Sequence, residues 1–243
     1  MIIDKEECTG CEACHPYCTV GAITTVEWEG ESVSEVNQDE CVECSICLRS
    51  EVCSTDAIFM PDLEWPRSIR AAFSNPLIPH RITGIGGRGT EEMKTNDVTG
   101  RFLLGVAGVA VEMGRPGVGT TFRDLQTVSM ALAKLGVEFE PQNPVTAIME
   151  ETNTGKINED ILDEKALSAI IEFTVDNDRL KEALKTLRDV STQISTVFSV
   201  GLISRVSGDG TVPTAAIARE AGFSPRLNTK TNVGLGKPLI EEA

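Results

Sequence analysis

The chain contains the stretch Cys8-Thr9-Gly10-Cys11-Glu12-Ala13-Cys14-His15-Pro16-Tyr17-Cys18, and its cysteine spacing returns further on. In each run three cysteines stand two residues apart and a fourth follows; the second run comprises Cys41, Cys44, Cys47 and Cys53. These two runs hold all eight cysteines of the 243 residues. Thiolate is a soft, anionic ligand that suits soft metal centres. The spacing therefore predicts two metal centres near the N-terminus, each with four cysteine ligands.

The type of metal centre follows from the spacing and the context. Three cysteines in close succession with a fourth a few residues on are typical of iron–sulfur clusters. Zinc sites usually pair two CxxC hooks across a longer loop, and disulfide frameworks belong to small secreted domains. Met1 is soon followed by the charged stretch 4–7, without the pattern of a signal peptide. We therefore expect iron–sulfur clusters in a cytoplasmic protein, with zinc and disulfides as the alternatives.

The repeat extends beyond the cysteines, since Gly21-Ala22-Ile23 after Cys18 corresponds to Asp56-Ala57-Ile58 after Cys53. Residues 1–60 resemble a two-cluster [4Fe-4S] bacterial ferredoxin. In that family the fourth cysteine of each run binds the cluster of the other run. The resemblance implies one cluster held by Cys8, Cys11, Cys14 and Cys53, and a second held by Cys41, Cys44, Cys47 and Cys18.

Two departures from the family pattern fall beside the fourth cysteines. Thr19 and Ser54 stand where the family usually has proline, and five residues, Leu48 to Val52, stand where three are usual. Such changes alter solvent access and hydrogen bonds at a cluster, so we expect the two clusters to be inequivalent. His15 is expected to be a spacer rather than a ligand, and Tyr17 an apolar cover.

Charge is concentrated in the first part of the chain. The net formal charge is −15, and residues 1–60 alone carry 13 acidic and two basic residues, or −11. This charge disfavours nucleic acid as a partner and favours a redox protein with a basic docking patch. Glu12 and Glu43, each inside a cysteine loop, are expected on that docking surface. The longest apolar run, Phe102 to Val111, is too short to span a membrane.

Four segments are expected along the chain: 1–60, a proline- and glycine-rich linker at 61–100, a domain at 101–206, and an extension at 207–243. The prolines of the linker are expected to interrupt any regular element; they are Pro61, Pro66, Pro76 and Pro79. The expected fold class is α+β. It combines a two-[4Fe-4S] ferredoxin domain with a second, ferredoxin-like domain.

Hydrophobic periodicity supports this organisation. A glycine turn joins the expected hairpin strands 23–28 and 32–36. In the second domain, strands are expected at 102–111, 137–139, 145–149, 171–175 and 197–206. A helix opens at the capping residue Thr121, a second is capped by Asp178, and a short one covers 215–221. The order βαββαβ is the split βαβ, ferredoxin-like pattern.

The glycine-rich segment before the second domain is a candidate binding loop. Gly84, Gly86 and Gly89 satisfy GxGxxG, but no convincing strand precedes them, so dinucleotide binding is disfavoured. Backbone amides of such a loop could still cradle a phosphate of a cofactor; the candidate residues are Gly86, Gly87, Arg88 and Gly89. The second domain contains no recognisable catalytic constellation.

Three further stretches carry a second resemblance: His80-Arg81-Ile82-Thr83-Gly84-Ile85-Gly86-Gly87-Arg88-Gly89-Thr90-Glu91-Glu92-Met93-Lys94-Thr95-Asn96-Asp97-Val98-Thr99-Gly100-Arg101, 111–117 and 231–239. They look like the ferredoxin-containing part of 6-hydroxynicotinate reductase-like proteins. That family implies ferredoxin-linked reduction of an electron-poor ring under anaerobic conditions. Its longer members carry a flavin-associated part that this chain lacks.

Three functions are consistent with these patterns. The first is an electron-transfer subunit of an oxidoreductase, docked to a flavin- or metal-containing catalytic subunit. The second is a self-contained reductase that binds flavin or substrate near Arg88, Lys94 and Arg101. The third is a redox-coupled sensor, whose βαββαβ domain binds a metabolite as ACT-type domains do.

Overall fold

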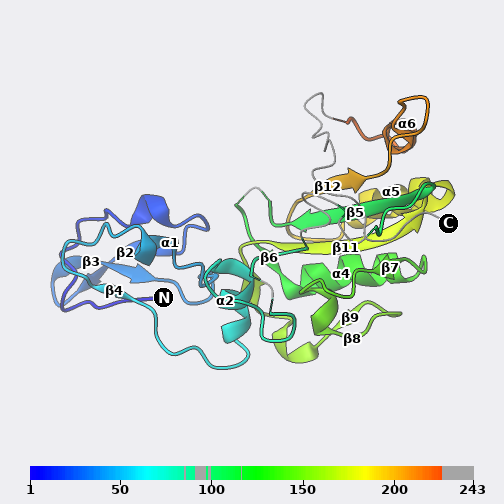
Figure 1. The fold of residues 1–243 in the computed structure, drawn as a ribbon. Helices are drawn as coiled ribbons and strands as arrows, with labels where there is room; N and C mark the ends of the chain where they lie inside the picture. The colour runs from blue at the N-terminus through cyan, green and yellow to red at the C-terminus, as the bar shows by residue number, and fades with distance from the viewer. Residues whose placement is uncertain (85, 91–96, 98–99, 116, 226–243) are drawn as a thin grey trace.

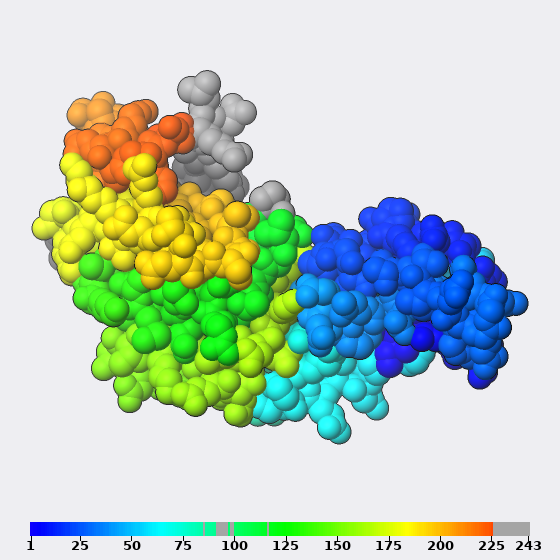
Figure 2. Space-filling model, turned by 180° about the vertical axis from the view of Figure 1, so that it is seen from behind, coloured from blue at the N-terminus to red at the C-terminus, as the bar shows by residue number. Residues whose placement is uncertain are grey.

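The computed structural model describes residues 1–84, 86–90, 97, 100–115 and 117–225. The chain forms two units, and the helix α2 (Ser68–Ser74) lies between them (Figure 1). Seen from behind, the N-terminal unit stands out as a separate lobe beside the larger one (Figure 2). Helices and strands are mixed along the chain, which confirms the expected α+β class.

The N-terminal unit is built from two short antiparallel pairs. β2 (Ile23–Trp28) and β3 (Glu31–Val36) form the expected hairpin, in which Ile23 faces Val36. β1 (Ile2–Ile3) pairs with β4 (Ile58–Phe59), which brings the two ends of the unit together. The single-turn helices η1 (His15–Tyr17) and α1 (Ile46–Arg49) lie within the two cysteine runs.

The core of this unit mixes aliphatic side chains with cysteines. Ala22 and Ile23 come from the first half, and their counterparts Ala57 and Ile58 from the second. They pack with Met1, Ile3, Val36, Cys14, Cys41 and Cys47. A unit of this size buries little apolar surface, so bound metal would add substantially to its stability.

The larger unit is organised around a four-stranded antiparallel sheet in the order β12-β5-β11-β7. Its strands are β5 (Val106–Met113), β7 (Glu138–Phe139), β11 (Ala169–Asp176) and β12 (Phe198–Ile203). α4 (Phe122–Ala133) connects β5 to β7, and α5 (Asn177–Val190) connects β11 to β12. The elements therefore follow one another in the order that the periodicity predicts. The first strand begins four residues later than expected, because Phe102 instead packs its ring over Gly108.

Both helices pack on one face of the sheet. Alternate residues of the central strands, such as Val109 and Phe173, point into the same core as Leu125 and Leu184 of the helices. Period two in the strands and period 3.6 in the helices place these side chains on facing surfaces. Thr121 caps α4, as expected, by accepting a hydrogen bond from the Asp124 amide at 3.1 Å.

The expected cap of α5 was wrong, because the helix begins earlier. Asp176 holds the N-cap position, and Asp178 lies in the first turn. There its negative charge interacts favourably with the helix dipole, but the residue does not hold the N-cap position.

Smaller elements complete the larger unit. η2 (Thr146–Ile148) and η3 (Glu159–Ile161) flank the pair formed by β8 (Met149–Glu151) and β9 (Lys156–Ile157). β6 (Thr120–Thr121) pairs with β10 (Lys165–Ala166), and α6 (Pro213–Glu220) packs on α5. The expected strand at 145–149 is thus mostly a 3-10 turn. None of the described helices combines the length and hydrophobicity of a membrane span.

The expectation that the linker lacks regular structure was wrong. α2 occupies residues between Pro66 and Pro76, so these prolines mark its two ends instead of preventing it. Ile69 and Phe73, one helical turn apart, are buried in the core of the larger unit. α2 is therefore an integral part of the structure.

Candidate metal centres

The two cysteine loops share one unusual backbone pattern. Positive φ angles occur at Gly10 and Glu12 of the first run and at the equivalent Glu43 and Ser45 of the second, at 67°, 58°, 56° and 57°. A further pair, Gly21 and Asp56, stands three residues after each fourth cysteine. Backbone that alternates between right- and left-handed residues turns successive amides toward the same side and forms an anion-binding concavity. The loops are therefore shaped to surround a negatively charged group.

Gly10 is required for two reasons. Besides its positive φ, a Cβ at this position would lie 2.0 Å from the carbonyl oxygen of Ser32 in β3. The equivalent Glu43 is free of that contact and carries a side chain in the same left-handed conformation, which is uncommon for a non-glycine residue. The two loops thus have the same backbone but pack against different surroundings.

The cysteines gather into two groups that cross between the runs. Cys8, Cys11, Cys14 and Cys53 line one pocket, together with Ile3, Ala57 and Ile58. In the other group, Cys18, Cys41 and Cys44 all lie close enough to Cys47 for their charges to act on it. All eight cysteines are free thiols. No group of three or more His, Cys, Asp or Glu side chains in the described residues is arranged to hold a single metal ion.

Backbone amides point at the cysteine sulfurs, which tests whether the loops fit an iron–sulfur cluster. Ala22 donates to Cys18 Sγ at 3.0 Å, and Ala57 donates to Cys53 Sγ at 3.3 Å, four residues after the cysteine in both cases. Ser34 of β3 donates to Cys8 Sγ at 3.3 Å. Such bonds are strongest when the sulfur is an anionic thiolate, and they adjust the reduction potential of a cluster. The donor set and the amides fit [4Fe-4S] clusters.

Burial controls the ionisation of the free thiols. Desolvation raises the pKa of Cys14, Cys41 and Cys44, and it raises the pKa of Cys47 to about 11, with added repulsion from Cys44 and Cys41. Burial also acts to raise the pKa of Cys53, but hydrogen bonds from Thr55 and the amides of Ala57 and Ile58 outweigh it, so that pKa is lowered. Metal binding must therefore displace protons from the buried thiols.

The expected docking role of Glu43 was wrong, because its side chain is fully buried at 0 % exposure. Its carboxylate accepts hydrogen bonds from Arg67 at 2.6 and 2.9 Å and pairs with the α-amino group of Met1. Glu12, by contrast, is exposed beside Cys11. The two equivalent loops therefore differ in surroundings, since the first is open to solvent and the second is covered.

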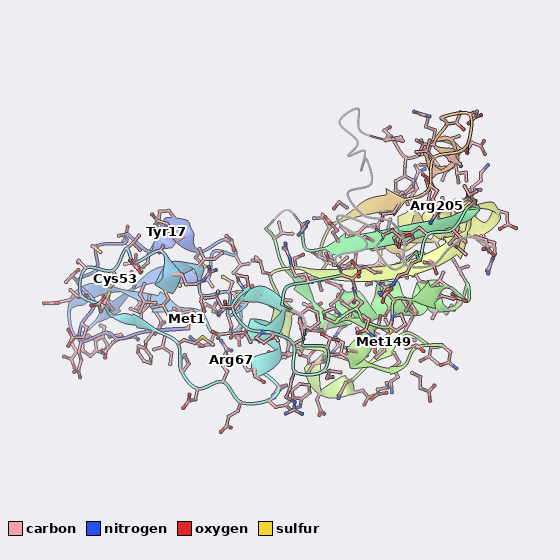
Figure 3. All side chains as sticks on the ribbon, in the orientation of Figure 1. Met1, Tyr17, Cys53, Arg67, Met149 and Arg205 are labelled. Atoms are coloured by element: carbon pink, nitrogen blue, oxygen red, sulfur yellow. The ribbon has the colours of Figure 1, made fainter. Side chains whose placement is uncertain are left out.

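The other residues near the cysteines occupy different positions. His15 Nε2 lies 3.0 Å from the hydroxyl of Ser34, which occupies this nitrogen. Tyr17, expected to cover a cluster, is instead 41 % exposed on the outer face of the unit (Figure 3). A backbone turn at Glu51, whose φ is 54°, follows α1 and accommodates the longer spacing before Cys53.

The glycine-rich candidate loop lies on the sheet face opposite the helices. Gly87 accepts a hydrogen bond from His80 at 3.1 Å, and Gly89 packs against Glu172. The Thr90 amide donates to both carboxylate oxygens of Glu172, at 3.0 and 2.9 Å. The anion next to this part of the loop is thus the chain's own carboxylate.

Arg88 of the same loop is half-buried. Burial and the nearby positive charge of Arg115 lower the pKa of Arg88, while Glu112 partly offsets them. Arg101 is paired with Glu140 at 2.5 Å. Lys94 and the stretch 231–239 lie outside the described residues. Phosphate binding by Gly86, Gly87, Arg88 and Gly89 stays a prediction.

A shallow cavity of about 170 Å³ lies where the two units meet. Val20 and Val42 line it from the N-terminal unit, and Gly119 and Thr121 line it from the larger unit. Val42 directly follows Cys41 in the sequence, and Val20 stands two residues after Cys18. The cavity is thus lined by close sequence neighbours of two cysteines of the second group, and it shares no lining residue with the pocket of the first group.

Sequence reasoning missed the basic residues of α2 and its flank. Arg67 and Arg70 reach the loop 38–43, although about thirty residues separate them along the chain. A helix bounded by prolines, with two arginines three residues apart, was the available signal.

Residues 1–24 match the family described as 4Fe-4S binding domain. The match covers the first cysteine run, and it assigns an iron–sulfur, electron-transfer role to this segment. No curated protein and no solved structure matches the chain.

Proposed function

We propose that the chain is an electron-transfer protein with two [4Fe-4S] clusters, and that it serves a larger anaerobic, cytoplasmic oxidoreductase. The observation that carries the proposal is the grouping of the eight cysteines. The fourth cysteine of each run lies with the first three cysteines of the other run, and the two loops share one backbone pattern. When bound, each cluster would take up and release one electron at a time.

The proposed ligands follow from the two groups of thiols. Cys8, Cys11, Cys14 and Cys53 would hold the first cluster, and Cys41, Cys44, Cys47 and Cys18 the second. The pocket shared by Cys53 and the first run supports this assignment, as does the effect of the charge of Cys18 on the Cys47 thiol. The amides of Ala22, Ser34 and Ala57 would stabilise the thiolates through hydrogen bonds.

The larger unit would dock the protein to a catalytic partner with a flavin or metal. Its helices and sheet bury an ordinary hydrophobic core, and the strand order is that of a split βαβ domain. The −11 charge of residues 1–60 supports a basic docking patch on the redox partner. An electron-poor ring is the substrate class that the resemblance to 6-hydroxynicotinate reductase-like proteins suggests for the assembly.

A self-contained reductase is the second candidate, because the junction cavity is lined by Val20 and Val42, which are close in sequence to Cys18 and Cys41 of the second group. A small electron acceptor bound there would lie next to Val20 and Val42. Absorbance of the purified protein distinguishes the candidates, since flavin bands on top of the iron–sulfur absorption would favour the reductase.

Metal and sulfide analysis tests the main proposal. After anaerobic reconstitution we expect about eight irons and about eight acid-labile sulfides per chain, because two complete four-cysteine sets are present. About four irons, or zinc in stoichiometric amount, would end the proposal.

A further inference from the structure

The segment around α2 makes hydrogen bonds to three alternate residues of the second cysteine loop, Cys41, Glu43 and Ser45. Arg70 donates to the carbonyl oxygen of Cys41 at 2.8 Å, and Arg67 donates to Glu43 at 2.6 Å. Asn75, at the end of α2, donates its amide to the hydroxyl of Ser45 at 3.1 Å. In the described residues no hydrogen bond runs from this segment to the first loop, 8–14. Among the described residues, the α2 segment therefore bonds to only one of two loops that share the same backbone conformation.

Arg70 makes the central connection. Its side chain is 7 % exposed, and besides Cys41 it donates to the carbonyls of Gln38 and Asp39 at 3.1 and 3.3 Å. Its Nε pairs with Glu164 of the larger unit. The carbonyl of Glu164 in turn accepts the amide of Phe122, the first residue of α4. One buried guanidinium thus joins the second cysteine loop to the sheet-containing unit.

The position of this charge matters for any redox centre held by the loop. Reduction adds negative charge, which a buried cation stabilises, so a nearby cation raises the reduction potential. Glu164 offsets part of this effect. Arg70 is closer to the loop than Glu164, because its Nη1 bonds directly to the carbonyl oxygen of Cys41 while Glu164 approaches its Nε from the larger unit. The charges of Glu43, the Met1 α-amino group and Arg67 also act on the Cys41 thiol, and in that set Glu43 is paired with both cations.

The first group of cysteines has the opposite environment. Cys11 and its neighbour Glu12 are exposed. Cys53, which shares their pocket, lies at the end of the N-terminal unit away from α2, whereas Arg67 lies between the two units (Figure 3). A redox partner can therefore approach the first group directly, while the loop of the second group is covered by the α2 segment.

We propose, on the basis of the function proposed above, that Arg70 is a positioning residue that holds the backbone of Cys41 and raises the reduction potential of the second cluster. Arg67 supports it by fixing Glu43 in the same loop. Electrons would then arrive at the exposed first group and be drawn toward the second, beside the larger unit.

Two substitutions of Arg70 test this role. Arg70→Gln removes the charge and keeps part of the hydrogen bonding, and Arg70→Lys keeps the charge. Potentiometric titration followed by EPR would measure the potential of each cluster. We expect Arg70→Gln to lower the potential of the second cluster and leave the first unchanged, with Arg70→Lys close to the wild type. Arg123→Gln is the matched control, because this arginine pairs with Asp163 on the exposed surface of the larger unit.

A second measurement covers the case in which Arg70→Gln folds poorly. Arg67→Gln should speed the loss of iron from the second cluster to a chelator, and leave the first unaffected. Equal shifts of both potentials in Arg70→Gln, no shift at all, or the same shift in Arg70→Gln and Arg70→Lys would overturn the inference. The iron content of the wild type separates its failure from that of the proposed function, since eight irons with an unshifted potential refute only the role of Arg70.

Discussion

Gly10→Ala should loosen the first cysteine loop far more than the same change at Gly21. Both glycines have nearly the same φ, 67° and 66°, so alanine would pay a similar left-handed strain of about 1–2 kcal/mol at each. At Gly21 the new Cβ would meet nothing within 4 Å, whereas at Gly10 it would lie 2.0 Å from the Ser32 carbonyl. Displacing that backbone atom adds roughly 1–3 kcal/mol, the usual range for overpacking. We therefore expect a total of roughly 2–5 kcal/mol for Gly10→Ala.

The rate of cluster loss in mild urea under anaerobic conditions would report these differences, because a cluster leaves only when its loop opens. A cost of about 1–2 kcal/mol raises the open population roughly 5–30-fold, which is the acceleration expected for Gly21→Ala. Gly10→Ala should exceed it by a further factor of roughly 5–150, the equivalent of the added 1–3 kcal/mol. If Gly21→Ala proved equal to or worse than Gly10→Ala, the close approach of loop and β3 would be refuted.

Three further predictions concern the crossed ligands, the docking charge and pH. Cys18→Ala should remove the EPR signal that Cys44→Ala also removes; loss of the signal that depends on Cys11 would reverse the ligand assignment. Electron transfer to the redox partner should slow several-fold between about 10 and 200 mM salt, as the Debye length falls from roughly 30 Å to below 10 Å. Glu12→Lys should slow it at low salt while Glu182→Lys on α5 should not, and flat rates would mean that the acidic face has no docking role. Burial lowers the pKa of His80 below 6.5, although its bond to Gly87 partly opposes this. Stability should therefore be full above pH 6.5 and fall below it, where the unfolded chain binds the proton first. Urea unfolding midpoints should show this slope, and a slope that persists in His80→Gln would exclude His80 as its source.

The parts of the structure that local patterns determine could be predicted from the sequence. Cysteine spacing located both loops, and hydrophobic periodicity found the hairpin 23–36 and the elements of the sheet-containing unit in their correct order. Thr121 was identified as a cap because its partner stands three residues away. These features depend on residues close together in the chain.

Features that depend on distant contacts could not be predicted. Glu43 looked like a surface charge, since nothing near it in sequence indicates that Arg67 covers it. Glu172 lies in an apolar strand and accepts the amide of Thr90, a partner 82 positions away. α2 was missed because prolines were interpreted as breakers, although at the borders of a helix they are compatible with it.

Counting electrons tests the central claim most directly. The anaerobically reconstituted protein would be titrated with a calibrated reductant while its visible absorbance and EPR are followed. Two [4Fe-4S] clusters predict uptake of about two electrons per chain, in two resolved steps, with both returned to an added oxidant. Uptake of one electron would mean that one cysteine set holds no cluster, and no reversible uptake would contradict the assignment of electron transfer.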